Sequence, residues 1–154
     1  MNKMIVFDMD GTIADLYGVD GWLNDLVNEN VRPYVNAKPL YDMDTLNTIL
    51  KLLKMQGWRI AITSWLAKGE HSVEYMNAIR TAKTAWLDRY AFPYDELHFV
   101  QYGYTKANCT RKYGGYQILV DDVEKIRKGW TLGDTIDANT NILDRLTGLL
   151  FEDF

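Results

Sequence analysis

Residues 4–12 read Met4-Ile5-Val6-Phe7-Asp8-Met9-Asp10-Gly11-Thr12, an apolar run that ends abruptly in two aspartates and a glycine. A continuous apolar run without alternation is typical of a strand that is buried on both faces of a sheet. The sequence therefore predicts a central strand over residues 3–8. Gly11 allows the chain to turn out of the sheet directly afterwards, because glycine adopts backbone conformations that other residues avoid.

Three further apolar runs are followed by polar residues in the same way. They are Trp58–Ile62, closed by Thr63-Ser64, then Leu97–Val100, and Tyr116–Val120, closed by Asp121-Asp122. Apolar residues at three- and four-residue spacing predict helices over 45–56, 69–90, 106–113, 123–129 and 139–150, with a shorter one near 20–29. Strands that alternate with helices imply right-handed crossovers. The expected fold is a three-layer α/β sandwich with a Rossmann-like parallel sheet.

The chain has 154 residues, of which 47% are apolar, and this excludes intrinsic disorder. A chain of roughly this length buries about 70% of its unfolded surface, which suits one core. No repeat, low-complexity tract or Pro/Ser linker interrupts residues 1–154, so we expect a single domain. With 17 basic and 21 acidic residues, the net charge is −4. The chain therefore lacks the basic excess that drives non-specific binding to nucleic acid.

A single cysteine, Cys109, excludes an intrachain disulfide framework and a cysteine-based zinc cluster. This fits a reducing compartment, and we expect a cytoplasmic protein. The first apolar stretch is cut at Asp8, too early for a signal-peptide core of about 7–15 residues, and no stretch reaches the ~18 apolar residues of a membrane span. We expect Cys109 to be a partly buried helix residue. His71 on a predicted helix and His98 on a predicted strand match no metal-binding pattern.

The residues directly after the strands are the first candidates for a site, because ligands of open α/β sheets bind outside the carboxyl ends of the strands. The sequence places the following residues there: Asp8, Asp10, Thr63, Ser64, Lys106, Asp121 and Asp122. Clustered carboxylates repel one another unless a cation lies among them, and Mg²⁺ takes carboxylates together with waters and a substrate phosphate. The sequence thus predicts a bound Mg²⁺ ion and a substrate that carries a phosphoryl group. Lys112 is an alternative to Lys106 as the lysine of this site.

Four segments resemble, in order and across the chain, the motifs of the haloacid dehalogenase (HAD) superfamily of phosphohydrolases. They are Asp8-Met9-Asp10-Gly11-Thr12, Ala61-Ile62-Thr63-Ser64, Lys106, and Ile118-Leu119-Val120-Asp121-Asp122. Within the superfamily, the motif Asp8-Met9-Asp10-Gly11-Thr12-Ile13-Ala14-Asp15 is most similar to that of the 5′(3′)-deoxyribonucleotidase group. The relatives carry a helical cap between the first two motifs, whereas only residues 13–57 are present here. The fold is thus expected to be capless, or to have a minimal cap within residues 15–44.

The resemblance implies catalytic roles for four residues. Asp8 would be the nucleophile that forms an aspartyl-phosphate, which splits the hydrolysis into two easier displacements. Asp10 would protonate the leaving oxygen and then serve as the base for the attacking water. Thr63 would hydrogen-bond a phosphoryl oxygen, while Lys106 would hold Asp8 and the phosphoryl charge in place.

The resemblance also implies binding residues. Backbone amides after Asp8 would complete the phosphate cradle, so the substrate-binding set is Thr63, Ser64, Met9, Gly11 and Trp65. The indole of Trp65, at the mouth of the site, would stack on a base or a sugar, with core packing as the alternative. The metal ligands would be Asp8, the carbonyl oxygen of Asp10, Asp122 and Asp121, with Asp122 ranked ahead of Asp121 as the direct ligand.

Together these features predict a Mg²⁺-dependent phosphomonoesterase that acts through an aspartyl-phosphate on nucleotides or other phosphorylated metabolites. One alternative is a phosphatase of macromolecular phosphate, on a nucleic-acid end or a phosphoprotein, because the site is expected to be open. Nucleic acid enters this prediction only as a substrate, and no membrane partner is expected. Another alternative is a phosphate-binding regulatory module without turnover. A homo-oligomer, in which a neighbouring chain covers the site, is compatible with each of these functions.

Overall fold

The computed structural model describes residues 1–154, and its framework is a parallel sheet of five strands in the order β5-β4-β1-β6-β7. The strands are β1 Lys3–Phe7, β4 Trp58–Trp65, β5 Glu96–Val100, β6 Tyr116–Asp121 and β7 Thr135–Asp137. The first four confirm the predicted strands, although β4 continues through Thr63 and Ser64 to Trp65. The edge strand β7 was not predicted, because three residues are too few to show a periodicity.

The register of the sheet aligns the carboxyl ends of its three middle strands. Phe7 on β1 lies beside Ile62 on β4 and Val120 on β6. The next residues along these strands are Asp8, Thr63 and Asp121. The polar residues that close the apolar runs therefore meet at one edge of the sheet.

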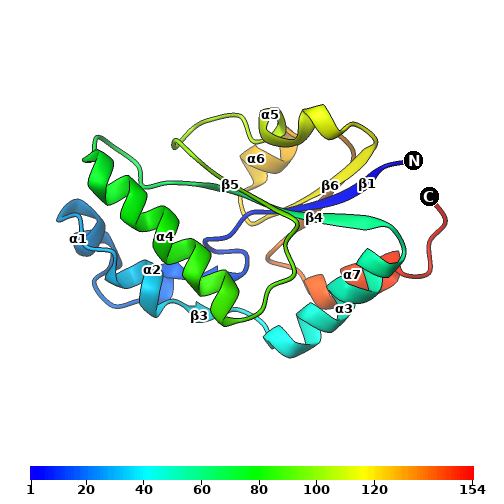
Figure 1. Ribbon diagram of the computed structural model, residues 1–154, viewed down its shortest axis with the longest axis horizontal. Helices are drawn as coiled ribbons and strands as arrows, with labels where there is room; N and C mark the ends of the chain where they lie inside the picture. The colour runs from blue at the N-terminus through cyan, green and yellow to red at the C-terminus, as the bar shows by residue number, and fades with distance from the viewer.

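Helices cover both faces of the sheet (Figure 1). The larger core lies between one face and α3 (Met43–Met55), α7 (Ile142–Leu149) and the C-terminal half of α4 (Val73–Arg89). On the other face, a smaller core includes residues of or beside α5 (Ala107–Thr110), the 3₁₀ turn η2 (Arg111–Tyr113) and α6 (Glu124–Lys128). This confirms the three-layer α/β sandwich.

Helix α3 shows how local sequence produces these elements. The side chain of Asp42 accepts a hydrogen bond from the Asp44 amide and caps the first turn. The helix buries a stripe of apolar side chains, Leu46, Ile49, Leu50 and Leu53. Each such side chain stabilises the fold by about 1.5–3 kcal/mol. Gly57 then turns the chain into β4 with a φ of 96°.

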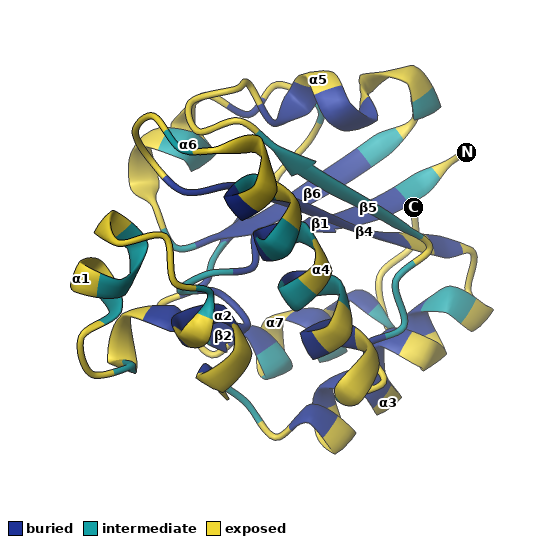
Figure 2. Cartoon of the chain, turned by 60° about the vertical axis from the view of Figure 1, so that its left-hand side comes forward, coloured by how far each residue is buried: buried dark blue, intermediate teal, exposed yellow.

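The segment between β1 and α3 is less regular than the rest (Figure 2). It contains β2 (Ala14–Asp15), η1 (Leu16–Gly18), α1 (Trp22–Val27), α2 (Arg32–Asn36) and β3 (Lys38–Pro39), and β2 pairs with β3 in antiparallel fashion. Only one short helix was predicted here. Helix α1 has no buried residue, whereas α2 buries Pro33 and Tyr34.

The structure also tests the predicted start of the long helix and the predicted positions of His71, Cys109 and His98. The predicted helix 69–90 begins only at Val73, where Ser72 caps it, so His71 lies in the preceding loop rather than on a helix. Cys109 lies on a helix, α5, as expected, but it is buried rather than partly buried, and His98 lies on β5 as expected. None of the helices combines the length and the apolar character that a membrane crossing needs.

Candidate active site

Lys106 joins the acidic residues that follow β1 and β6. Its Nζ donates to Asp8 Oδ1 and to Asp121 Oδ2, each at 2.8 Å, and only 4% of the residue is exposed. Lys106 lies at the N-terminal end of α5 and lines the cavity at the carboxyl edge of the sheet. Lys112, the alternative, is exposed on η2 beside the ring of Tyr113. The structure thus brings Lys106, and not Lys112, to the acidic residues.

Three carboxylates converge at this edge. Asp8, Asp121 and Asp122 each offer an oxygen, and these oxygens all lie within 4.8 Å of one another. Thr12 Oγ1 lies 3.0 Å from Asp8 Oδ2 and 3.4 Å from Asp122 Oδ1. Gly11 has a φ of 80°, which strains other residues, and a Cβ there would lie 2.5 Å from Asp122 Oδ2 and would displace that carboxylate. An oxygen-only, largely buried cluster of this kind fits a hard cation such as Mg²⁺.

The electrostatics of the cluster favour a bound cation. Burial raises the pKa of Asp122 to about 7, and the charges of Asp8 and Asp121 add to the effect. The pKa of Asp121 is also raised, by burial and by Asp8, although Lys106 opposes the rise. Burial alone would lower the pKa of Lys106, but Asp8 and Asp121 outweigh it and raise that pKa. The acidic groups therefore hold more negative charge than one lysine offsets.

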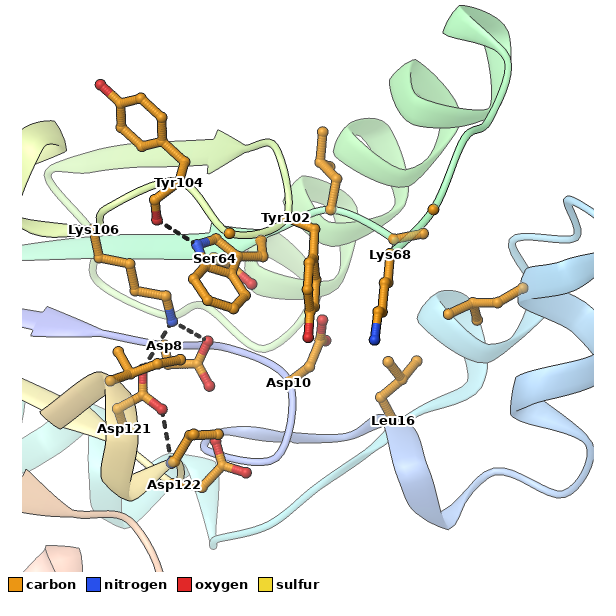
Figure 3. A pocket seen from close by; sticks show the side chains of 18 of the residues that line it. Asp8, Asp10, Leu16, Ser64, Lys68, Tyr102, Tyr104, Lys106, Asp121 and Asp122 are labelled. Carbon is orange, nitrogen blue, oxygen red and sulfur yellow. Dashed lines mark hydrogen bonds and ion pairs between the residues drawn. The ribbon is translucent and has the colours of Figure 1, made fainter. Parts of the chain in front are cut away.

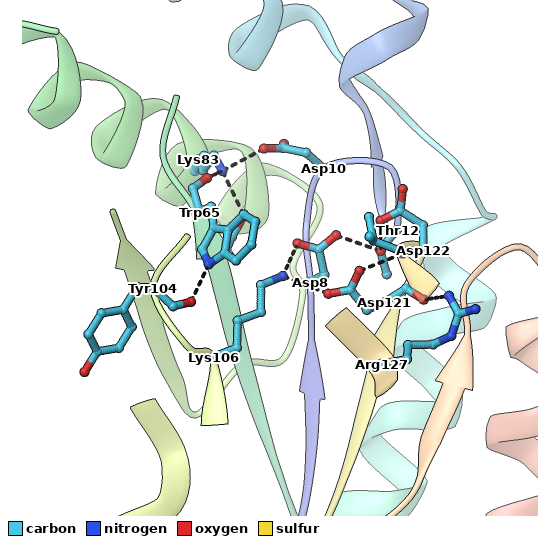
Figure 4. Close-up of polar contacts among 12 residues, drawn as sticks. Asp8, Asp10, Thr12, Trp65, Lys83, Tyr104, Lys106, Asp121, Asp122 and Arg127 are labelled. Atoms are coloured by element: carbon cyan, nitrogen blue, oxygen red, sulfur yellow. Dashed lines mark hydrogen bonds and ion pairs between the residues drawn. The ribbon is translucent and has the colours of Figure 1, made fainter. Parts of the chain in front are cut away.

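Asp10 lies apart from this cluster (Figure 4). Its Oδ2 accepts a hydrogen bond from Lys83 Nζ at 2.8 Å, and Asp8 lies between Asp10 and the two aspartates after β6. Burial raises the pKa of Asp10, while Lys83 opposes the rise. Lys83 was not predicted as a site residue. The available signal was a lysine in the buried stripe of α4, which also includes Tyr75, Ile79, Trp86 and Leu87.

The residues at the end of β4 have separate surroundings. Thr63 is fully buried, and its Oγ1 has no hydrogen-bond partner. Ser64 Oγ accepts a hydrogen bond from Lys83 at 2.9 Å. The indole of Trp65 donates to the carbonyl of Tyr104 at 2.8 Å and lies beside the Lys106 ammonium, 5.4 Å from it. Of the two hydroxyl groups at the end of β4, that of Thr63 is therefore the one without a hydrogen-bond partner.

The loop after Asp8 is closed by backbone hydrogen bonds of its own. The Met9 carbonyl accepts hydrogen bonds from the amides of Thr12, Ile13 and Ala14. The side chain of Met9 is buried in the core. The Gly11 amide donates to the Ala14 carbonyl at 2.8 Å. In this structure Gly11 shapes the loop, and its amide is not free for a phosphoryl oxygen.

A cavity of about 1000 Å³ opens beside Asp8 and Asp10 (Figure 3). Ser64, Trp65 and Lys106 line it, together with Asp121 and Asp122. The ring of Tyr102 packs against that of Trp65, with centroids 4.8 Å apart. Apolar residues of α1, including Leu23 and Val27, form a further part of the wall. The site is thus more enclosed than an open sheet edge.

The parallel five-stranded sheet with helices on both faces defines a three-layer α/β protein. A search against models of protein families found no match, and no curated protein sequence matched either. Two solved structures share the fold, both of D,D-heptose 1,7-bisphosphate phosphatases. The enzyme from Burkholderia thailandensis is 15% identical, over 86% of this chain and 75% of that chain, with a TM-score of 0.53. The enzyme from B. bronchiseptica, complexed with magnesium and phosphate, is 12% identical over 96% and 99% of the chains, with a TM-score of 0.57.

Proposed function

We propose that this protein is a Mg²⁺-dependent phosphomonoesterase that acts through an aspartyl-phosphate on Asp8. The observation that carries the proposal is the arrangement around Asp8. Lys106 donates to Asp8, two further carboxylates lie within 4.8 Å of it, and a second acid, Asp10, lies apart from them and lines the same cavity. Phosphoryl transfer needs positioning and charge stabilisation above all, and this arrangement supplies both.

In the first step, an oxygen of Asp8 bonds to the phosphorus while the bond to the leaving oxygen breaks. Asp10 gives its proton to that leaving oxygen, and then takes a proton from the water that hydrolyses the aspartyl-phosphate. Lys106 orients Asp8 throughout, since its Nζ lies 2.8 Å from Oδ1. The unused hydroxyl of Thr63 donates to a phosphoryl oxygen.

Asp8, Asp122 and the carbonyl oxygen of Asp10 would hold Mg²⁺, with Asp121 beside them. The metal would neutralise the carboxylates and the phosphoryl oxygens. Both oxygens of Asp121 are already engaged, Oδ2 with Lys106 and Oδ1 with the Val123 amide. This supports Asp122 as the direct ligand.

The proposed substrates are nucleotides or other phosphorylated metabolites. A cavity of about 1000 Å³ suits a small or medium-sized molecule, and pockets for such ligands typically span about 300–1,000 Å³. Residues 15–44, which contain α1, would serve as the minimal cap of a single domain, and a cytoplasmic location remains a prediction. A macromolecular substrate would have to present its phosphate past α1.

A phosphatase screen tests the proposal. The panel contains mononucleotides, sugar phosphates, phosphopeptides and 5′- or 3′-phosphorylated oligonucleotides, each with Mg²⁺ and with excess chelator. We expect activity that requires Mg²⁺ and that Asp8→Asn reduces at least about 100-fold, since the variant lacks the nucleophilic oxygen. The wild-type protein, but not the variant, should bind beryllium fluoride. Phosphate binding without turnover by the wild type would instead support a regulatory module.

A further inference from the structure

The ammonium group of Lys83 is fully buried and fully used. The residue is 0% exposed in the middle of α4. Its Nζ has three donors, which reach Asp10 Oδ2 at 2.8 Å, Ser64 Oγ at 2.9 Å and the Trp65 carbonyl at 2.9 Å. The rings of Tyr34 and Phe99 lie 5.4 and 5.8 Å from it. The position of this charge is therefore fixed.

Stability alone does not account for a lysine at this position. Lys83 occupies the buried stripe of α4, in which its neighbours are Ile79, Trp86 and Leu87. Burying an ion pair costs desolvation, and apolar side chains of similar volume often give equal or greater stability. An ordinary core would accept methionine or leucine here. The presence of a charged side chain here is explained better by its hydrogen bond to Asp10, which orients that carboxyl group.

Lys83 determines which oxygen of Asp10 is available. Its hydrogen bond occupies Oδ2, so a proton carried by Asp10 resides on Oδ1, the oxygen left for the cavity that Asp10 lines. Two more bonds tie Lys83 to Ser64 and Trp65 at the end of β4. Lys83 thus connects the loop after β1 to β4, and it holds Asp10 on the side of Asp8 that faces away from Asp121 and Asp122 (Figure 4).

We propose that Lys83 is a positioning residue that orients Asp10 for proton transfer to the leaving oxygen. The inference rests on the proposed function. When the phosphorus–oxygen bond to the leaving group breaks and the bond to Asp8 forms, the proton on Asp10 Oδ1 passes to the departing oxygen. Lys83 stays protonated and exchanges no atom with the substrate.

A leaving-group series distinguishes this role from a structural one. Substituted phenyl phosphates have nearly the same size, but their phenols differ in acidity, so their dependence on a proton donor differs. In Lys83→Met, we expect kcat/KM for phenyl phosphate to fall about 100-fold, and that for 2,4-dinitrophenyl phosphate to fall less than about 3-fold, since general acid catalysis contributes about 10²–10⁴-fold. The plot of log kcat/KM against phenol pKa would become steeper.

Four further variants complete the experiment. Asp10→Asn should show the same steep slope, and Asp10→Asn combined with Lys83→Met should add nothing, because the two side chains act as one unit. Lys83→Gln, which keeps a donor, should lie between wild type and Lys83→Met, and it replaces Lys83→Met if that protein does not fold. Arg80→Met, which removes a cation from the same helix one turn away, should keep the wild-type slope.

The outcomes separate the two proposals. An equal loss for every phenyl phosphate in folded Lys83→Met or Lys83→Gln, or additive losses in the double variant, would overturn the role of Lys83 and leave the proposed function standing. A wild-type protein that hydrolyses none of these esters in Mg²⁺ would overturn the proposed function, and the role of Lys83 with it.

Discussion

Thr63 has a polar group that the fold leaves without a partner. Its hydroxyl is buried at the end of β4, next to the acidic edge, and it accepts and donates nothing within the protein. An unsatisfied buried hydroxyl costs about 1–3 kcal/mol, so a ligand that bonds to it recovers this free energy. The residue is thus suited to a phosphoryl oxygen.

Thr63→Val tests this, because valine has nearly the same shape and lacks the hydroxyl. We expect the unfolding temperature to stay equal or to rise, and the binding of inorganic phosphate in Mg²⁺ to weaken about 10-fold, which corresponds to one hydrogen bond of about 1.4 kcal/mol. Calorimetric titration and thermal unfolding measure the two effects. Thr110→Val is the matched control, since Thr110 is also buried with an unpartnered hydroxyl but lies on α5 rather than at the carboxyl end of β4. Unchanged phosphate affinity in Thr63→Val would contradict the assignment.

The raised pKa of Asp122 predicts that the stability of the metal-free protein depends on pH. Its pKa rises from 3.8 to about 7 on folding, mainly through burial. Between these values the folded state keeps a proton that the unfolded state has released, so the contribution of Asp122 to stability falls as the pH rises through about 4–7. Above that window, the unfavourable charge is fully present in the absence of a cation.

Asp122→Asn removes this charge. In excess chelator, we expect the variant to gain in unfolding temperature over wild type more at pH 8 than at pH 5, whereas Mg²⁺ should stabilise wild type and have little effect on the variant. Thermal unfolding at both pH values, with and without Mg²⁺, measures this. A gain that is the same at pH 5 and pH 8 would show that the Asp122 charge is not the cause.

At the scale of elements, α1 lines the site and packs only lightly on the core, through the partly buried Leu26. It has no buried residue, yet Leu23 and Val27 line the cavity, and Leu23 is 58% exposed. Exposed apolar side chains gathered at a cavity suit contact with a ligand better than they suit water. Helices α3 and α7, in contrast, are held by buried apolar stripes.

Leu23→Ser is therefore expected to alter binding and not folding. The unfolding free energy should change by less than about 0.5 kcal/mol, as for most exposed positions. For a bulky ester such as naphthyl phosphate, KM should rise about 5-fold at nearly constant kcat, since about 40 Å² of apolar contact contributes about 1 kcal/mol. Val35→Ser is the control, because Val35 is similarly exposed on α2 but lies outside the cavity. Equal effects of the two substitutions on KM would show that α1 does not contribute to substrate binding.

At the scale of the whole molecule, one prediction concerns association. A site without a large lid keeps out less water and gains less from remote binding energy. We expect either a monomer that accepts bulky or generic phosphomonoesters, or an oligomer whose interface borders the cavity near Tyr17 or Trp22. Light scattering, combined with the substrate screen, distinguishes the two. A strict monomer with tight selectivity for one small phosphate would contradict both.

The sequence by itself was sufficient for the layers of the fold and for the acidic edge. The apolar runs that end in Asp8, Thr63 and Asp121 reveal strands buried on both faces, because such strands need no alternation of apolar and polar residues. Their ends meet because a parallel sheet aligns carboxyl termini. The roles of Asp8, Asp10 and Lys106 came from the resemblance of their motifs, and they remain predictions.

Only the tertiary structure decided which groups touch. Lys83 and Asp10 are 73 residues apart in the chain, and no local pattern links them, since their contact depends on how α4 packs over the end of β4. The edge strand β7 and the wall formed by α1 were likewise decided by packing, because a strand of three residues or a helix of six residues carries too weak a periodic signal. Periodicity reports which face of an element is buried, whereas a site depends on distances between elements, and those are fixed only when the whole chain packs.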